Sequence, residues 1–75
     1  MQLNVLIISP TQMIFKGQAK SVTLPGEMGV FEVLPFHKRM MTRLLGGKVD
    51  VDGRLFDIKR GAVKIDQNNI TIILE

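Results

Sequence analysis

Residues 48–59, KVDVDGRLFDIK, decide the fold that this sequence predicts. Apolar and charged residues alternate on both sides of Asp52-Gly53, as they do in strands that bury one face. Asp-Gly is a strong signal for a two-residue hairpin turn, because both of its residues tolerate a positive φ. We therefore predict two antiparallel strands joined at this turn. The residues predicted to face the core are Val49, Val51, Phe56 and Ile58.

Working outward, short apolar segments separated by turn residues occupy the rest of the chain. Further strands are predicted at residues 3–8, 13–15, 19–24, 62–65 and 70–74, and residues 40–45 fit a strand or a single helical turn. Turn residues end these segments, most clearly Ser9-Pro10-Thr11, Gly46-Gly47 and the tetrad 66–69. About 8–10 such strands predict one all-β domain, residues 1–75, built as a flattened antiparallel β-sandwich or barrel.

The length and composition make a partner the expected source of extra stability. A domain of this size buries only roughly 60% of its unfolded surface. The sequence has no cysteine, which excludes disulfides and thiolate metal sites and indicates a reducing compartment. It has no apolar run of the roughly 18 residues that a membrane span needs, and no cationic region follows Met1 to mark a secretory signal. We expect a soluble intracellular protein.

Residues 3–8, LNVLII, are apolar on both faces of the predicted strand. Every second residue from Leu3 is apolar, and so are Leu6 and Ile8 between them. A strand with one face in solvent alternates more strictly than this. The strand therefore either lies inside a sandwich or uses its second face to contact another protein.

No set of residues in the sequence predicts catalysis, a cofactor or a metal site. Asp50 and Asp52 share a strand face, but no third oxygen ligand lies near them, so we interpret both as solvated charges beside the turn. Ser9 and Ser21 lack the G-x-S-x-G setting of a nucleophile. His37 is the one side chain that titrates near neutral pH, and we interpret it as a loop residue that contacts backbone or a partner.

Residues 24–41, LPGEMGVFEVLPFHKRMM, are the stretch that strand formation explains least. Three methionines, Met28, Met40 and Met41, favour an adaptable interface over a core. The surrounding turns carry two glycines and two prolines, which shape a loop rather than a regular strand.

Three cations near this stretch, Lys38, Arg39 and Arg43, leave two interpretations open. They form either a solvated edge or pairs with acids on another subunit. They also permit an alternative function, in which a small basic β-barrel of net charge +3 binds single-stranded nucleic acid. The chain has no Trp or Tyr and only four Phe, which is a poor supply of residues for stacking on bases.

The sequence of residues 22–37, VTLPGEMGVFEVLPFH, resembles the signature region of the epsilon subunit of F-type ATP synthases. In that family a strand that ends near P-G is followed by E-G, an acid and an aromatic, and then by L-P-G-H-A-P-L-L-T. Upstream, residues 9–17 resemble the family's S-P-x-x-x-x-F-x-G. Downstream, residues 58–65 and 69–72 resemble its L-x-G-G-x-x-x-V and N-x-V-T-V. The similarity covers essentially the whole chain.

The resemblance implies a ten-stranded β-sandwich and a non-catalytic role in the central stalk of the rotor. The domain would contact the gamma subunit and the ring of c subunits, coupling proton transport to ATP synthesis, with no nucleic acid partner. It would be peripheral, on the cytoplasmic side of the bacterial inner membrane, and membrane-associated only through the complex. By matching position, the gamma-subunit interface would comprise Ser9, His37, Met40, Met41 and Thr42. The c-ring interface would comprise Gly29, Val30, Phe31 and Glu32.

The sequence departs from the family's pattern at four places, one of which is a shorter hairpin around Asp52-Gly53. Val30 stands where the family has an acid, although Glu32 follows on the same side of an extended segment. The motif's G-H-A-P is replaced at residues 36–39 by F-H-K-R, a bulkier and more cationic loop. The family's C-terminal helical hairpin, which can inhibit ATP hydrolysis, does not follow Glu75. Two interpretations stay open, a natural short form and a truncated chain, and Met1 at the start favours a natural short form without this inhibitory element.

Overall fold

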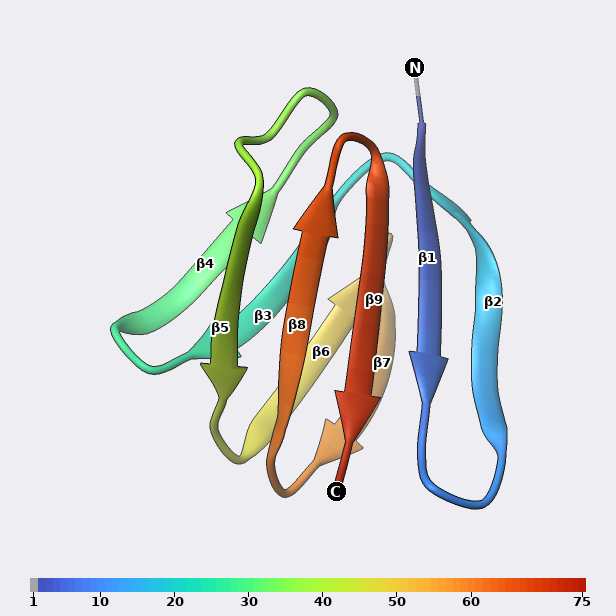
Figure 1. The fold of residues 1–75 in the computed structure, drawn as a ribbon, viewed down its shortest axis with the longest axis vertical. Coiled ribbons are helices and arrows are strands. Elements are labelled where there is room, and N and C mark those ends of the chain that lie inside the picture. The colour runs from blue at the N-terminus through green and yellow to red at the C-terminus, as the bar shows by residue number, and fades with distance from the viewer. Residues whose placement is uncertain (1) are drawn as a thin grey trace.

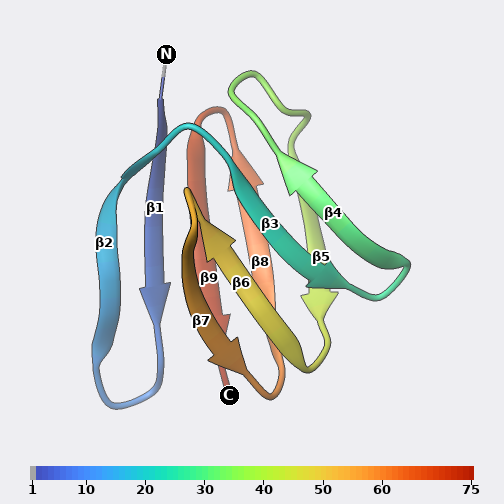
Figure 2. The ribbon, with the colours of Figure 1, turned by 180° about the vertical axis from the view of Figure 1, so that it is seen from behind.

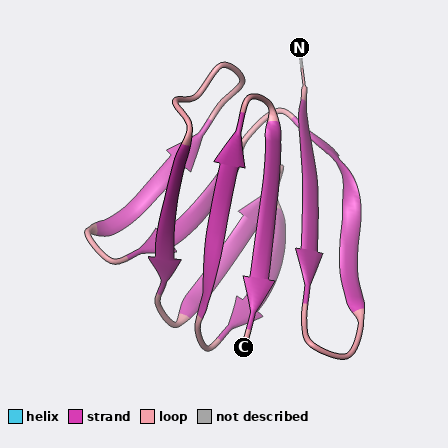
Figure 3. Ribbon diagram, in the orientation of Figure 1, coloured by secondary structure: helices cyan, strands magenta, loops and turns pink. Residues whose placement is uncertain are grey.

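The computed structural model describes residues 2–75 as nine β-strands joined by short turns, with no helix among them (Figure 3). The predicted all-β sandwich of about 8–10 strands is confirmed. The strands are β1 (Leu3–Ile8), β2 (Met13–Ala19), β3 (Val22–Gly26), β4 (Gly29–Val33), β5 (Met40–Leu44), β6 (Gly47–Val51), β7 (Arg54–Ile58), β8 (Gly61–Asp66) and β9 (Asn69–Leu74).

One continuous sheet folds back on itself to make two layers. Its strand order is β2-β1-β9-β8-β5-β3-β6-β7. β5 and β6 pair with opposite ends of β3, and β4 pairs with β3 along its whole length. We call β2-β1-β9-β8-β5 the front layer, which faces the viewer in Figure 1, and β4-β3-β6-β7 the rear layer, which faces the viewer in Figure 2. A single residue pair, Gly26 opposite Leu44, joins β3 to β5. Because β4 pairs with β3 alone, the side of the sandwich between β4 and β5 is open.

One strand pair departs from the expected antiparallel arrangement. β1 and β9 run parallel, with Val5 opposite Ile70 and Ile7 opposite Ile72. Parallel neighbours need a long connection between them, and these two strands have the other seven between them in sequence. The first and last strands of the chain thus lie side by side in the middle of the front layer (Figure 1).

The single strand predicted at residues 19–24 belongs to two strands in the structure. Ala19 ends β2 and Val22 begins β3, because the chain bends at Lys20-Ser21 and crosses from the front layer to the rear layer. The Asp52 carboxylate holds this bend by accepting hydrogen bonds from the backbone N–H of Lys20 (2.9 Å to Oδ2) and of Ser21 (3.0 Å to Oδ1). The strand predicted at residues 13–15 is also too short, because β2 runs on to Ala19. Gly17 stays within β2, and the ring of Phe15 fills the space where a side chain would project.

The hairpin predicted from Asp52-Gly53 is confirmed. These two residues have φ values of 50° and 89° and connect β6 to β7, with Val51 opposite Arg54. Both values lie in the left-handed region that a two-residue hairpin turn of this type requires.

The core between the layers is entirely apolar. No polar or charged side chain is buried within residues 2–75. The buried hydrophobic side chains of the core are Leu3, Val5, Ile7, Ala19, Val22, Leu24, Val33, Leu44, Val49, Val51, Ile58, Val63, Ile65, Ile70 and Ile72. They include three of the four residues predicted from the first hairpin, and Phe56, the fourth, is half-buried against the same cluster. In this strand assembly β1 buries Leu3, Val5 and Ile7 and turns its second face outward.

Side chains close the gap between the two ends of the sheet. The rings of Phe15 on β2 and Phe56 on β7 lie with their centroids 5.5 Å apart. The Arg54 guanidinium lies 5.4 Å and 5.7 Å from the two ring centroids. Such cation–π contacts add to the aromatic pair, so this edge is sealed while the edge between β4 and β5 remains open.

Candidate docking surfaces

The open edge of the sandwich forms a hollow of about 340 Å³ between β4, β5 and the loop that joins them. Its lining contains six of the nine residues for which the sequence predicts an interface. From the c-ring group these are Gly29, Val30 and Phe31, and from the gamma group they are His37, Met40 and Thr42. The two groups, predicted for different partners, thus meet at one hollow.

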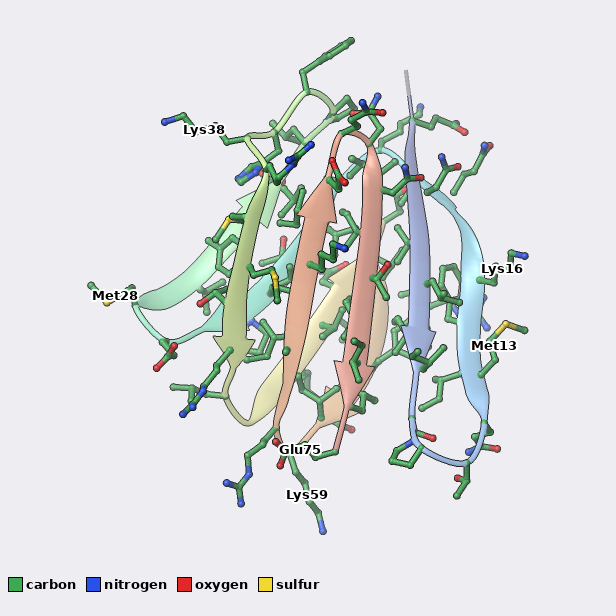
Figure 4. All side chains as sticks on the ribbon, viewed as in Figure 1. Met13, Lys16, Met28, Lys38, Lys59 and Glu75 are labelled. Carbon is green, nitrogen blue, oxygen red and sulfur yellow. The ribbon has the colours of Figure 1, made fainter. Side chains whose placement is uncertain are left out.

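The β3–β4 hairpin shapes one wall of this hollow. Glu27 and Met28 form its two-residue turn, and Gly29 has a φ of 116°. The Phe31 ring packs onto Gly26 so closely that a Cβ built on Gly26 would lie 2.6 Å from it. Met28 projects into solvent at the tip of the hairpin (Figure 4). Of the three methionines assigned to an interface, Met28 and Met41 are exposed and Met40 packs partly against the core.

The loop between β4 and β5 forms the end of the hollow. Its Phe36 has a φ of 70°, at the position where the resembling motif has glycine. The Phe36 N–H donates to Asn68 Oδ1 at 2.9 Å. His37 donates from Nδ1 to the Lys38 carbonyl oxygen at 2.7 Å, which leaves Nε2 as an acceptor in the neutral ring. The sequence alone indicated a bulky, cationic loop here but not its left-handed backbone.

The outward side of the front layer, which we call the front outer face, is the second surface of interest. The strand register arranges its side chains in three rows that run across the strands. The apolar row contains Met13, Ile8, Ile73 and Ala62 and ends at the exposed Arg43 on β5. The middle row contains Lys16, Leu6, Thr71, Lys64 and Met41. The polar row contains Gln18, Asn4, Asn69 and Asp66.

Apolar side chains on this face are strongly exposed. Met41 is 74% exposed, Met13 60% and Ile73 48%. Met13 and Lys16 project outward from β2 at the edge of the layer (Figure 4). The sequence pointed to such a face through the apolar residues on both sides of β1, but Met13 and Ile73 were not predicted as interface residues.

Hydrogen bonds order the polar row. Gln18 Nε2 donates to Asn4 Oδ1 at 3.3 Å, and Asn4 Nδ2 donates to Asn69 Oδ1 at 3.1 Å. Arg39 extends the row through an ion pair with Asp66, with 3.2 Å between Nε and Oδ1. Side chains of the polar row therefore hydrogen-bond to one another. In the apolar row, the side chains of Met13 and Ile73 remain about half exposed to solvent.

The remaining predicted residues lie apart from the hollow. Met41 is on the front outer face, because on β5 it alternates with the inward-facing Met40 and Thr42. Ser9 follows β1 at the far end of the front layer, opposite the β4–β5 loop (Figure 1). Glu32 is exposed on β4 in the rear layer. The predicted gamma group is thus spread over the whole front layer rather than gathered at one point.

The two aspartates considered as a carboxylate pair instead hold turns. Asp50 Oδ1 accepts from the Gly53 N–H at 2.6 Å, and Asp52 binds the N–H groups of Lys20 and Ser21. These backbone hydrogen bonds, chiefly that of Lys20, lower the pKa of Asp52. From the sequence, both residues are interpreted as solvated charges beside the turn, whereas in the structure each also accepts backbone hydrogen bonds. Across residues 2–75, no three His, Cys, Asp or Glu side chains are grouped to hold a metal ion.

The part of the chain that the structure describes contains no helix that could cross a membrane.

Comparison with known proteins identifies the family to which this domain belongs. Residues 2–75 match the family described as ATP synthase, Delta/Epsilon chain, beta-sandwich domain. The chain is 36% identical to the ATP synthase epsilon chain of Campylobacter jejuni over 95% of its length and 59% of that relative's length. It is 38% identical to the epsilon chain of Rickettsia typhi, covering 97% of this chain and 73% of the relative. The chain spans about 60% of the length of the first curated relatives it matches.

Solved structures agree on the fold. A chain of the Euglena gracilis mitochondrial ATP synthase, solved with OSCP, F1 and the c-ring, superposes with a TM-score of 0.88 at 18% identity. That alignment covers 97% of this chain and 50% of the other. A chain of the Tetrahymena thermophila central stalk and c-ring superposes with a TM-score of 0.79 at 13% identity, over 99% and 63% of the two chains. The resemblance found in the sequence is confirmed, and the chain belongs to the family of ATP synthase delta/epsilon chain β-sandwich domains.

Proposed function

We propose that this chain is a non-catalytic component of the central stalk of an F-type ATP synthase. It docks on the gamma subunit and the c-ring and so helps to couple proton transport to ATP synthesis. The observation that carries the proposal is an uncovered apolar face on a domain that matches the family over residues 2–75. Of the solved relatives, one belongs to an assembly of central stalk and c-ring.

The gamma subunit covers the front outer face in this proposal. The face runs from Ser9 at one end of β1 to Met41 on β5, which are two members of the predicted gamma group. The same face carries the apolar side chains of Met13 on the edge strand β2, 60% exposed, and of Ile73 on β9, 48% exposed. Contiguous exposed apolar surface rimmed by polar residues marks interaction sites in proteins. His37, Met40 and Thr42 extend the contact at the hollow.

The c-ring contacts β4 in this proposal, through Gly29, Val30, Phe31 and Glu32. Val30 is 74% exposed, and Glu32 is exposed beside it on the same side of the strand. The two-residue turn makes Gly26 and Gly29 a hydrogen-bonded pair, so the alternating ladder leaves the N–H and C=O of Val30 and Glu32 at the open edge. These backbone groups are available to form hydrogen bonds with the polar loops of a c-ring.

The experiment is a binding titration between this chain and the gamma subunit of the same organism. We expect a complex that co-elutes in size-exclusion chromatography at micromolar concentrations. Folded chain that stays separate from folded gamma at these concentrations would refute the gamma part of the proposal. For the c-ring, a photoreactive cysteine label at Val30 should join the chain to subunit c in the assembled synthase, and labelling of other subunits only would refute that part.

The alternative of single-stranded nucleic acid binding has no observation in its favour. Phe15, Phe31 and Phe56 are half-buried and pack against the core, so Phe36 is the only exposed ring within residues 2–75. One of the three cations, Arg39, already pairs with Asp66. Base stacking needs a platform of successive aromatic rings. Retention of this chain on single-stranded oligonucleotides at low salt would revive this alternative.

A further inference from the structure

Phe36 combines two unfavourable features, a left-handed backbone and an exposed aromatic ring. Its backbone φ of 70° lies in the left-handed region, where a bulky residue is an outlier. Its side chain is 75% exposed, so the ring gains little from burial in this domain. A residue held in a sparsely populated conformation is a reason to look for a function at that position.

The surrounding structure fixes this conformation. The Phe36 N–H donates to the side chain of Asn68, which lies in the turn between β8 and β9. The Asn68 carbonyl oxygen in turn accepts the Asn4 N–H at 2.7 Å, which ties that turn to β1 in the front layer. The backbone at Phe36 is therefore held in one conformation, and its ring projects from a fixed point on the surface. Aromatic residues of this kind dominate binding energy at protein interfaces, because little conformational entropy is lost when they dock.

The charges around Phe36 indicate what it meets. Residues 33–45 contain three cations and no Asp or Glu. Asp66 faces this loop from β8, and it is already paired with Arg39. Lys38 points outward from the loop into solvent (Figure 4) and takes part in none of the ion pairs formed within residues 2–75. Leu34, 49% exposed, adds apolar surface in the same loop.

We propose that Phe36 is an anchor that inserts into an apolar pocket with a carboxylate rim on the gamma subunit. The inference rests on the proposed function and adds to it the residue that carries the binding and the chemistry of the partner's pocket. Phe36 adjoins His37, a member of the predicted gamma group, and so lies at the end of the same contact surface. Lys38 supplies the charge that meets the acidic rim.

The test separates binding from folding. Asn tolerates the left-handed region, so Phe36→Asn removes the ring without straining the backbone. We expect its urea midpoint to equal or exceed that of the unaltered chain, while its Kd for gamma rises at least tenfold, or about 1.4 kcal/mol. The matched control is Leu55→Asn, because Leu55 is 56% exposed on β7 in the rear layer. Its Kd should stay within about twofold.

A second variant tests the rim. Lys38→Glu should slow association with gamma several-fold, and this slowing should diminish at high salt, because complementary charges act mainly on the association rate. An equal association rate for Lys38→Glu would overturn the acidic rim.

Three results would overturn the anchor. Phe36→Asn could bind gamma as tightly as the unaltered chain, or it could lower the urea midpoint enough to account for its weaker binding. Vesicles of anionic phospholipid could retain the unaltered chain and release Phe36→Asn, which would assign the ring to a membrane surface. If the unaltered chain fails to bind gamma, the proposed function falls together with this inference; if it binds and the variant binds equally, only this inference falls.

Discussion

Replacing Met41 with Glu tests whether the front outer face is a docking surface. Met41 is 74% exposed in the free chain, so about three quarters of its surface is available for a partner to cover. Full burial of a methionine side chain is worth about 1.5–3 kcal/mol, which gives about 1–2 kcal/mol for this fraction. Glu loses that contribution, and its charge must also be desolvated in the interface, at a cost of several kcal/mol that the opposite Lys64 offsets only in part. We therefore expect the Kd for gamma to rise more than about 100-fold.

The free chain should fold as before with this substitution. Position 41 lies opposite Lys64 in the β5–β8 register, so the new carboxylate faces a cation. Exposed substitutions of this kind change the free energy of unfolding by less than about 0.5 kcal/mol. Isothermal titration calorimetry with gamma and urea unfolding measure the two quantities, and Leu55→Glu on the rear layer is the matched control. A Kd for Met41→Glu no weaker than that for Leu55→Glu would refute the reasoning.

Three further predictions concern the fold. Asp52→Asn should destabilise the chain at pH 7, and because the folded pKa of Asp52 lies below its ordinary 3.8, the urea midpoints of variant and unaltered chain should converge as pH falls below that value. Gly61→Ala should lower Tm, because its Cβ would collide with the Ile73 carbonyl oxygen and overpacking costs about 1–3 kcal/mol; an unchanged Tm by calorimetry would contradict this. Leu24→Ala should cost about 2–5 kcal/mol in urea unfolding, and the half-exposed Leu45→Ala much less, since Leu24 is fully buried.

Local signals in the sequence predicted local structure well. The Asp52-Gly53 turn and the alternation beside it specify the β6–β7 hairpin without help from the rest of the chain, because both the turn geometry and the side-chain period are properties of neighbouring residues. The same holds for the boundaries of β5 and β9, whose apolar residues end at glycine or polar turns.

Features that depend on distant residues were not predictable in this way. The bend at Lys20-Ser21 is held by Asp52, more than thirty residues further along the chain, so a strand prediction based on residues 19–24 alone could not find it. The parallel β1–β9 pair joins the two ends of the sequence, and strand patterns do not specify such a partner. Gly17 looks like a strand terminator until Phe15 is seen to cover it.

For the predicted interface residues, too, the sequence indicates individual residues, whereas only the fold brings them together. The resemblance pointed to Gly29, Phe31, His37 and Met40 as parts of two interfaces, and these residues line one hollow because the sheet folds back between β5 and β3 and brings β4 opposite β5. Their meeting is a property of the fold and not of their spacing. The rows of the front outer face likewise follow from strand register, which is why Met13 and Ile73 could not be selected from the sequence.

Cross-linking from the front outer face tests the central claim most directly. The chain has no cysteine, so Met41→Cys gives a single attachment point for a photoreactive maleimide, with Leu55→Cys on the rear layer as its matched control. In the assembled synthase, docking through the front outer face predicts that the label at residue 41 joins the chain to gamma and that the label at residue 55 does not. Gamma adducts from residue 55 and none from residue 41 would contradict it.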